Sequence, residues 1–202
     1  MTTVIAIDLG GTNLRAALID SADATILAHT AVPTPVTGPS GDAITAAIIA
    51  RVEALLASAP GRSVRAIGVA SAGPLDLDRG RVTNSPNIAF PVVEITGPLN
   101  ERFGLPVALI NDARAGVLGE RWAGAARGSD NVVYVTLSTG IGGGAVVNGR
   151  LLLGATGNAG EIGHIVMQIG GPLCGCGNRG CLEALASRSA IERDIREAVA
   201  AG

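Results

Sequence analysis

All three cysteines of the chain and one of its two histidines lie in one short segment, as His164, Cys174, Cys176 and Cys181. Three thiolates and one imidazole are a ligand set that Zn²⁺ prefers in closed structural sites. The three glycines between the cysteines allow the tight backbone turns that would bring the sulfur atoms together. The alternative is a group of small buried apolar side chains beside an unrelated histidine. The clustering favours a structural zinc site, and any catalytic chemistry has to come from other residues.

The composition excludes several classes of enzyme. All 15 basic residues are arginine, so the chain has no lysine for a P-loop, for the ATP-binding strand of a protein kinase, or for a Schiff base. The second histidine, His29, lies in an early strand-like run, and His164 belongs to the cysteine cluster. A Ser-His-Asp hydrolase therefore has no free histidine in a suitable context.

The overall composition is that of a globular protein with one large or two modest domains. The 202 residues are 48% hydrophobic and 16% charged. A net charge of −2 and an aromatic content of 2% argue against nucleic acid as a partner. The sequence contains no apolar run long enough for a membrane span and no signal-peptide pattern. An odd number of cysteines beside a histidine suits a reducing compartment, so we expect a cytoplasmic protein without membrane or nucleic-acid partners.

The first half of the chain has the pattern of an α/β fold. Apolar residues alternate in three early runs, a loop rich in proline and glycine follows, and a long segment then has helical spacing. Two apolar runs further on predict buried strands, separated by a loop-rich stretch with one short helix. We expect strands at 3–8, 14–20, 25–32, 64–70 and 107–110, and helices at 42–59 and 98–103.

The pattern restarts after residue 131. The second half predicts strands at 132–137, 145–147 and 151–153, a glycine turn at 140–144, and helices at 113–122 and 182–200. Both halves thus contain a βββ unit in which a glycine turn follows a polar or acidic residue. Glycine alone explains the bends, but it does not explain the hydroxyl-bearing residue beside each of them.

These motifs, taken in order, resemble the ROK family of sugar kinases and repressors over the whole chain. The resemblance rests on seven segments: Asp8–Arg15, Ala70–Pro74, Ser85–Asn87, Asn111–Ala113, Ser138–Gly144, Gly160–His164 and Cys174–Glu183. It implies an actin-like, ribonuclease-H-like α/β ATPase fold with two lobes, each built on a βββαβα-type mixed sheet. It also implies ATP-dependent phosphorylation of a hexose hydroxyl, in the manner of a glucokinase.

The same resemblance predicts the domain organisation. Residues 1–113 correspond to a small N-terminal lobe, and residues 114–202 to part of a large lobe that continues further in other family members. We therefore expect an N-terminal portion in which the second lobe is incomplete and the adenine pocket is not visible. A repressor of this family needs a helix-turn-helix before the first strand. Here we expect the first strand to begin at Thr3, which leaves no room for that motif and argues for a kinase. A non-catalytic sugar-binding fragment is the third alternative.

Phosphoryl transfer needs a cradle for the phosphates and a metal ion, and the family motifs supply candidates for both. Backbone N–H groups of the two glycine turns can form anion-binding nests in place of the absent lysine. Asp8 is expected to hold Mg²⁺, through water, although it could instead be an aspartate that caps the turn. The residues predicted to bind MgATP are Asp8, Gly10, Gly11, Thr12, Asn13, Thr139 and Gly140.

Asp112 is the predicted catalytic base. It follows the apolar strand 107–110, and α/β sheets present functional groups at the carboxyl ends of their strands. A carboxylate there can accept the proton of the attacking sugar hydroxyl and orient its oxygen. The structural alternative is an N-cap for the following helix, and that role is compatible with catalysis.

The resemblance also implies the sugar ligands. His164 would bind zinc through one ring nitrogen and offer the other to a sugar hydroxyl, so the metal would act indirectly. Glu183 could alternatively be a solvated charge in the first turn of the last helix. The family is usually dimeric, and its substrates include glucose, fructose, mannose and N-acetylated amino sugars, among which the sequence does not choose. The predicted sugar-binding residues are Asn87, Asn111, Asp112, Glu161, His164 and Glu183.

Overall fold

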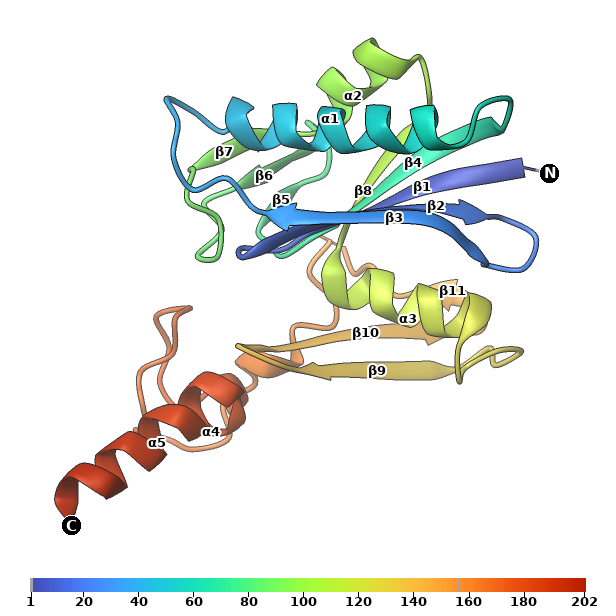
Figure 1. The fold of residues 1–202 in the computed structure, drawn as a ribbon. Coiled ribbons are helices and arrows are strands. Elements are labelled where there is room, and N and C mark those ends of the chain that lie inside the picture. The colour runs from blue at the N-terminus through green and yellow to red at the C-terminus, as the bar shows by residue number, and fades with distance from the viewer. Residues whose placement is uncertain (1, 156) are drawn as a thin grey trace. The chain divides into compact units, whose positions relative to one another are not determined.

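The computed structural model describes residues 2–155 and 157–202 and shows there an α/β protein with one mixed sheet and two antiparallel sheets (Figure 1). The chain forms two compact units, Met1–Asp112 and Ala113–Gly202, called here the N-terminal and C-terminal units. In the described residues the N-terminal unit holds two sheets and the C-terminal unit holds one, so each unit is described by itself.

The N-terminal unit is built on a five-stranded sheet with the order β3-β2-β1-β4-β8. The first three strands are antiparallel, and β4 and β8 run parallel to β1. This mixed arrangement places the carboxyl ends of β1, β4 and β8 at one edge. The strands are β1 (Thr2–Leu9), β2 (Asn13–Asp20), β3 (Ile26–Pro33), β4 (Ser63–Ser71) and β8 (Val107–Asn111).

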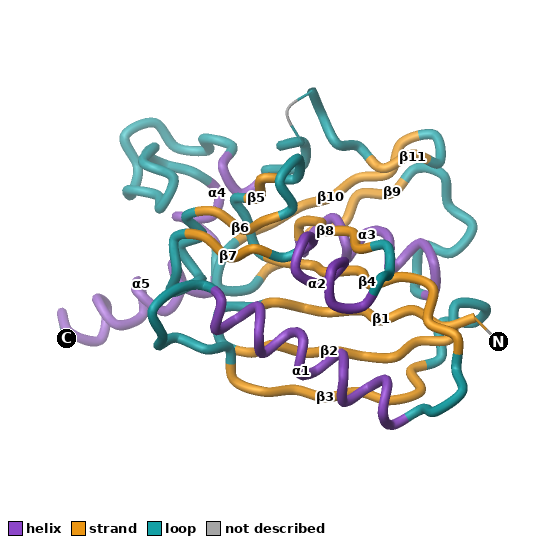
Figure 2. The backbone as a smooth tube through the Cα atoms, turned by 90° about the horizontal axis from the view of Figure 1, so that it is seen from above, coloured by secondary structure: helices purple, strands orange, loops and turns teal. Residues whose placement is uncertain are grey.

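Helix α1 (Asp42–Ser58) crosses one face of this sheet, as two perpendicular views agree (Figures 1 and 2). Ile44, Ile48, Val52 and Leu55 are buried at helical spacing, and alternate residues of β1 are buried in the same cluster. The predicted helical period of 3.6 residues in α1 and strand period of 2 residues in β1 therefore direct apolar side chains into one core. This core holds the strand ends in place.

Truncation of Ile48 tests that core. Its side chain is 0% exposed, so Ile48→Ala should lower the free energy of unfolding by about 2–5 kcal/mol. Ile26→Ala is the control, because Ile26 is 61% exposed in the same unit and should change stability far less. Urea denaturation of both variants measures the difference. Equal losses would contradict the assignment of the core.

The loop-rich stretch expected between residues 70 and 107 contains more structure than the sequence indicated. A small antiparallel sheet lies there. Arg81 links its strands by ion pairs with Asp76 (3.2 Å) and Glu94 (3.3 Å). Its strands are too short for a clear alternation pattern, which explains why the prediction missed them. They are β5 (Leu75–Asp76), β6 (Arg81–Thr83) and β7 (Val92–Glu94), followed by helix α2 (Thr96–Phe103).

The C-terminal unit contains helix α3 (Asp112–Ala123) and an antiparallel sheet with the order β11-β10-β9. The predicted glycine turn at 140–144 is wrong, because β10 begins at residue 141 and pairs with β9 along its length. A Cβ atom on Gly143 would lie 2.7 Å from the carbonyl oxygen of Gly160, so this glycine permits a close approach of two segments. The strands are β9 (Val132–Leu137), β10 (Ile141–Val147) and β11 (Arg150–Leu151), the last ending before the predicted residue 153.

The single helix predicted over 182–200 is two helices, α4 (Leu182–Ala186) and α5 (Arg188–Ala201). Ser187 separates them with an extended backbone, and its side chain accepts a hydrogen bond from the N–H of Ala190 at 3.2 Å. Serine favours such a capping position over a helix interior. A short 3₁₀ helix, η1 (Ile162–His164), was not predicted.

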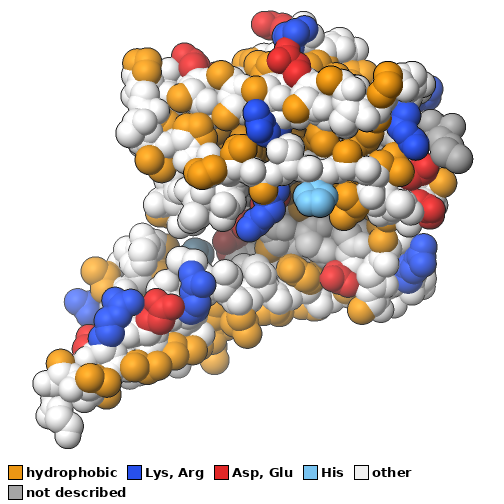
Figure 3. Space-filling view, in the orientation of Figure 1, with side chains coloured by type: hydrophobic (Ala, Val, Ile, Leu, Met, Phe, Trp, Pro, Cys, Tyr) orange, Lys and Arg blue, Asp and Glu red, His pale blue; other side chains and the backbone are white. Residues whose placement is uncertain are grey.

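No helix in the described residues combines the length and apolar character that crossing a membrane would require. On the face drawn in Figure 3, basic and acidic side chains are interspersed rather than gathered into areas of one sign. That distribution agrees with the small net charge of −2.

Candidate active site and metal centre

The first glycine turn, Gly10–Thr12, joins β1 to β2 and is hydrogen-bonded to the residue that follows β3. The hydroxyl of Thr34 donates to the carbonyl of Gly10 at 2.7 Å, and its N–H donates to the carbonyl of Thr12 at 3.0 Å. In a planar trans peptide the next N–H points opposite to the carbonyl, so the N–H of Gly11 points away from Thr34. The N–H of Gly10 donates to the Asn13 carbonyl at 3.0 Å, so it is the N–H of Gly11 that suits an anion here.

Asp8, the predicted Mg²⁺ residue, lies beside this turn and opposite Arg15 across the β1–β2 pair. The Arg15 guanidinium donates to the Asp8 carboxylate at 2.9 Å, and both side chains are substantially exposed. The pair orients the carboxylate and adds a positive charge at the turn. One available carboxylate is compatible with Mg²⁺, which keeps several water ligands.

Asn87, a predicted sugar ligand, is exposed in the loop between β6 and β7. This loop packs directly on the first glycine turn, since a Cβ atom on Gly11 would lie 2.1 Å from the Asn87 carbonyl oxygen. Only glycine allows that approach of two backbones. The N-terminal unit therefore brings a predicted phosphate turn and a predicted sugar loop into contact.

Asn111 and Asp112 occupy the junction of β8 and α3. Asn111 ends β8 opposite Ser71 of β4, and Asp112 is the exposed first residue of α3. A strand end followed at once by a helix presents both side chains at the carboxyl edge of the sheet. An acidic residue is also favourable in the first helical turn, so a helix-stabilising role of Asp112 is compatible with its predicted catalytic role.

The second glycine turn, Ser138–Gly140, joins β9 to β10 and is tied to helix α5. The N–H of Arg188 donates to the carbonyl of Ser138 at 2.9 Å, and its guanidinium donates to the hydroxyl of Thr139 at 3.0 Å. The anchored Ser138 carbonyl directs the N–H of Thr139 away from the Arg188 N–H. The first turn is thus held by two of its carbonyls and the second by one.

Glu161 and His164 lie on the segment that approaches the β10 glycines. Glu161 is exposed and precedes η1, at whose end His164 is partly buried. The segment is anchored by Arg114 of α3, which is only 3% exposed and donates to the Ala159 carbonyl at 3.3 and 2.8 Å. A buried guanidinium needs such acceptors, so Arg114 helps to fix the backbone that carries Glu161.

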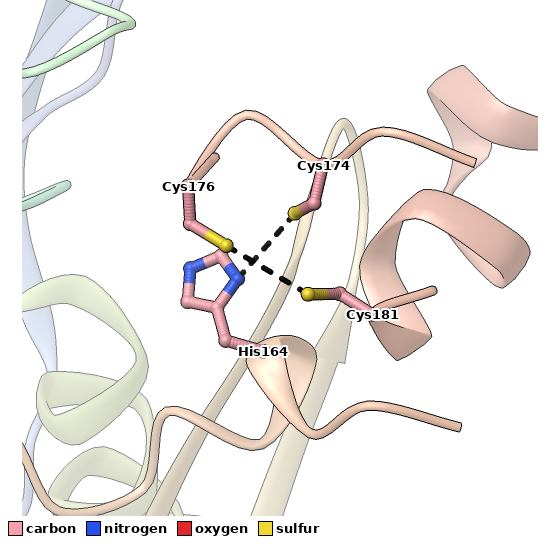
Figure 4. A group of neighbouring side chains, drawn as sticks. All are labelled: His164, Cys174, Cys176 and Cys181. Atoms are coloured by element: carbon pink, nitrogen blue, oxygen red, sulfur yellow. Dashed lines mark hydrogen bonds between the residues drawn. The ribbon is translucent and has the colours of Figure 1, made fainter. Parts of the chain in front are cut away.

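The four predicted zinc ligands converge, as Figure 4 shows. Their ligand atoms all lie within 4.8 Å of one another. The Sγ of Cys174 is 3.7 Å from Nδ1 of His164, and the Sγ atoms of Cys176 and Cys181 are also 3.7 Å apart. With Zn–S bonds of about 2.3 Å, a tetrahedral site has ligand separations of about 3.8 Å. The group, called here the Cys₃His cluster, has separations that fit Zn²⁺, with Nδ1 of His164 as the nitrogen that faces the sulfur atoms.

Local backbone geometry builds this cluster. The N–H of Gly177 donates to the carbonyl of Cys174 at 2.9 Å and closes a turn. Gly177 and Gly180 adopt φ of +90° and +75°, a conformation that other residues rarely take. Burial, together with the neighbouring Cys176 and Cys174 thiols, raises the pKa of the Cys181 thiol to about 12. A bound cation would offset this penalty on the thiolate.

Glu183, the last predicted sugar ligand, lies in α4 directly after the cluster. One carboxylate oxygen accepts the N–H of Ile141 at 2.9 Å, and the other is 3.9 Å from the Cys174 sulfur. The carboxylate is half-buried, so a solvated charge with no partner is excluded. The C-terminal unit therefore brings together Glu183, the Cys₃His cluster and the second glycine turn.

The chain belongs to the ROK family, which it matches over residues 4–201. This confirms the resemblance based on the ordered motifs. The chain is 44% identical to a glucokinase of Thermotoga maritima over 198 residues, which are 96% of this chain and 60% of that protein. It thus spans about 60% of the length of the curated relative.

Two solved structures are similar. A ROK family glucokinase from Streptomyces griseus, in complex with glucose and AMPPNP, has a TM-score of 0.82 and 38% identity, covering 98% of this chain and 62% of that one. A ROK family transcriptional regulator, a homologue of the E. coli MLC protein, has a TM-score of 0.86 and 30% identity, covering 100% of this chain and 50% of that one. The predicted actin-like α/β fold is confirmed.

Three arginines at these sites were not predicted from the sequence to be functional residues. Arg15 pairs with Asp8, Arg114 holds the segment before Glu161, and Arg188 holds the second turn. Cross-strand spacing could have indicated Arg15, because it lies directly opposite Asp8. The acceptors Ala159 of Arg114 and Thr139 of Arg188 are 45 and 49 residues away, and no local pattern points to them.

Proposed function

We propose that this protein is an ATP-dependent hexose kinase of the glucokinase type. The observation that carries the proposal is the 44% identity to a glucokinase across 96% of the chain. Two glycine turns with anchored carbonyls, and an aspartate directly after β8, are parts that suit phosphoryl transfer.

In this proposal Asp112 accepts the proton of the attacking sugar hydroxyl, and the two turns hold the nucleotide phosphates. Asp8, oriented by Arg15, would hold Mg²⁺, which when bound neutralises phosphate charge. A set of polar side chains would recognise the sugar hydroxyls, because some of these side chains would lack a hydrogen-bond partner when the wrong sugar binds. The proposed sugar ligands are Asn87, Asn111, Asp112, Glu161, His164 and Glu183.

We also propose structural Zn²⁺ at the Cys₃His cluster, supported by its ligand separations. The three free cysteines support a reducing, cytoplasmic location. A homodimer follows from the family resemblance alone, and the small net charge supports the absence of a nucleic-acid partner. Residues 1–113 and 114–202 are the proposed small lobe and part of the large lobe.

A sugar-responsive regulator is the second candidate, because a transcriptional regulator of the family matches the whole chain with a TM-score of 0.86. A coupled assay of ADP release with MgATP and a panel of hexoses separates the two. Sugar-dependent ADP release supports the kinase. Sugar binding without turnover would overturn the kinase proposal in favour of a regulator or a non-catalytic sugar-binding protein.

Substitution of Gly11 tests the contact between the first turn and the Asn87 loop. The added Cβ in Gly11→Ala would displace one of the two backbones, and a misplacement of about 1 Å can cost about 100-fold in rate. We expect kcat/KM to fall by about that factor. Gly97→Ala is the control, since a Cβ there meets nothing within 4 Å. Unchanged kinetics in Gly11→Ala would show that this contact does not matter to the reaction.

A further inference from the structure

Residues near the junction of α4 and α5 form hydrogen bonds with the second glycine turn and with the residue that follows it. Glu183 accepts the N–H of Ile141, which directly follows the turn, at 2.9 Å. Arg188 donates to the Ser138 carbonyl at 2.9 Å and to the Thr139 hydroxyl at 3.0 Å. Three hydrogen bonds on consecutive parts of one turn fix the direction of its peptide groups.

The helix that leads to this junction, α4, begins directly after the Cys₃His cluster. Cys181 directly precedes α4, and Glu183 is two residues further on. The Glu183 oxygen that does not bind Ile141 is 3.9 Å from the Cys174 sulfur. Gly140 makes room for this arrangement, because a Cβ atom there would lie 2.4 Å from the Glu183 carboxylate. A single side chain thus contacts both the cluster and the turn.

We propose that metal occupancy of the Cys₃His cluster sets the affinity of the second glycine turn for nucleotide phosphate, with Glu183 and Arg188 as positioning residues. This inference rests on the proposed role of the turn in nucleotide binding. It assigns the metal an effect on the nucleotide, in addition to the orientation of His164 toward the sugar.

The physical reason is the small apolar core around the cluster. Among the described residues, the buried apolar cluster in this region is small and consists of Cys174, Cys181 and Ala184, so apolar packing holds the start of α4 weakly. A metal that cross-links Cys174 and Cys181 to His164 restricts the start of α4 and therefore the Glu183 carboxylate. When that restriction is lost, the Ile141 N–H loses its acceptor and the turn samples other peptide orientations.

Hydrogen exchange at the Ile141 amide measures the link without any catalytic activity. In the zinc-loaded protein this amide should be protected, and removal of the metal should speed its exchange at least about tenfold, since a lost hydrogen bond of about 1.4 kcal/mol corresponds to that factor. Equal protection with and without metal would overturn the proposal.

Variants separate a specific link from general loss of structure. Glu183→Ala should expose the Ile141 amide while the cobalt-substituted cluster keeps its thiolate charge-transfer spectrum. Glu183→Gln should restore protection, because its amide oxygen can still accept the Ile141 N–H. An Ile141 amide that stays protected in Glu183→Ala would refute the role of this side chain.

Arg188→Ala should weaken binding of MgATP, measured without sugar, by about five- to 150-fold, and should raise KM for ATP more than KM for the sugar. Arg196→Ala is the control on the same helix. Its side chain is exposed and pairs only with Glu192 among the described contacts. An equal effect of the two substitutions would overturn the positioning role of Arg188.

Thermodynamic linkage supplies the decisive measurement. If the metal raises nucleotide affinity by some factor, the nucleotide must raise metal affinity by the same factor. Transfer of Co²⁺ to a chelator, with and without ATP, should therefore show that nucleotide retains the metal, and equal affinities would refute the coupling. If the loaded protein fails to bind MgATP at all, the proposed function fails, whereas the exchange of Ile141 still reports on Glu183 by itself.

Discussion

Asp112→Asn should lower kcat for hexose phosphorylation by about 10²–10⁴-fold, the usual contribution of a general base. Asparagine has nearly the same shape and can still orient the sugar hydroxyl by hydrogen bonding, but it cannot accept the proton at neutral pH. KM for ATP should change little, because Asp112 belongs to neither glycine turn. Steady-state kinetics on the hexose panel measures both constants.

Asp42→Asn is the matched control for this substitution. Asp42 is also an exposed acidic residue in the first turn of a helix, in α1. Both variants keep a side chain that is favourable at a helix start, so their unfolding free energies should agree within about 0.5 kcal/mol. A loss of kcat in both variants, or in neither, would contradict the assignment of Asp112 as the base.

Removal of the metal should have the largest effect on structure. The segment from η1 to α4 should unfold in the metal-free protein, while the five-stranded sheet of the N-terminal unit should remain folded. Structural Zn²⁺ binds zinc-finger peptides with about 10–16 kcal/mol, which is comparable to the whole stability of a domain, about 5–15 kcal/mol. The N-terminal unit has a large buried core of its own, whereas the cluster region buries few apolar side chains.

Peptide-level hydrogen exchange before and after chelation measures this difference. Among the substitutions, His164→Ala should reproduce the effect of chelation, and His29→Ala should not, because His29 is exposed in β3 and no described metal cluster includes it. Simultaneous unfolding of both units would contradict the independent core. Full protection of residues 164–187 after complete chelation would contradict the structural role of the metal.

Much of the fold could be predicted because its signals are local. Alternation in β1 and helical spacing in α1 are properties of short windows, and the structure buries the faces that they indicate. The Cys₃His cluster is equally local, since all four ligands fall in one segment whose glycines permit the turns. The short strands β5–β7 had too few residues to show a period, and they were missed.

The wrong predictions concern residues whose role depends on distant partners. Glycines 142–144 have the composition of a turn, but they pair with β9 and leave room for α3 and for the segment before His164. The helix expected over 182–200 has an uninterrupted helical composition, yet Ser187 breaks it and caps α5. For the glycines, contacts outside the local window outweigh the local preference; at the helix break, the N–H of Arg188 donates to the distant Ser138 carbonyl while Ser187 caps α5 locally.

The sequence by itself determined the kinds of chemistry available to this protein. Without lysine, phosphate contacts from this chain would have to use other donors such as backbone N–H groups, hydroxyls and arginine, and its three thiols with His164 are a ligand set that suits a metal. Only the tertiary structure decided which groups meet. The Gly11 backbone contacts Asn87, and Glu183 reaches Ile141 across 42 residues, because a folded chain brings together positions whose separation no sequence period records.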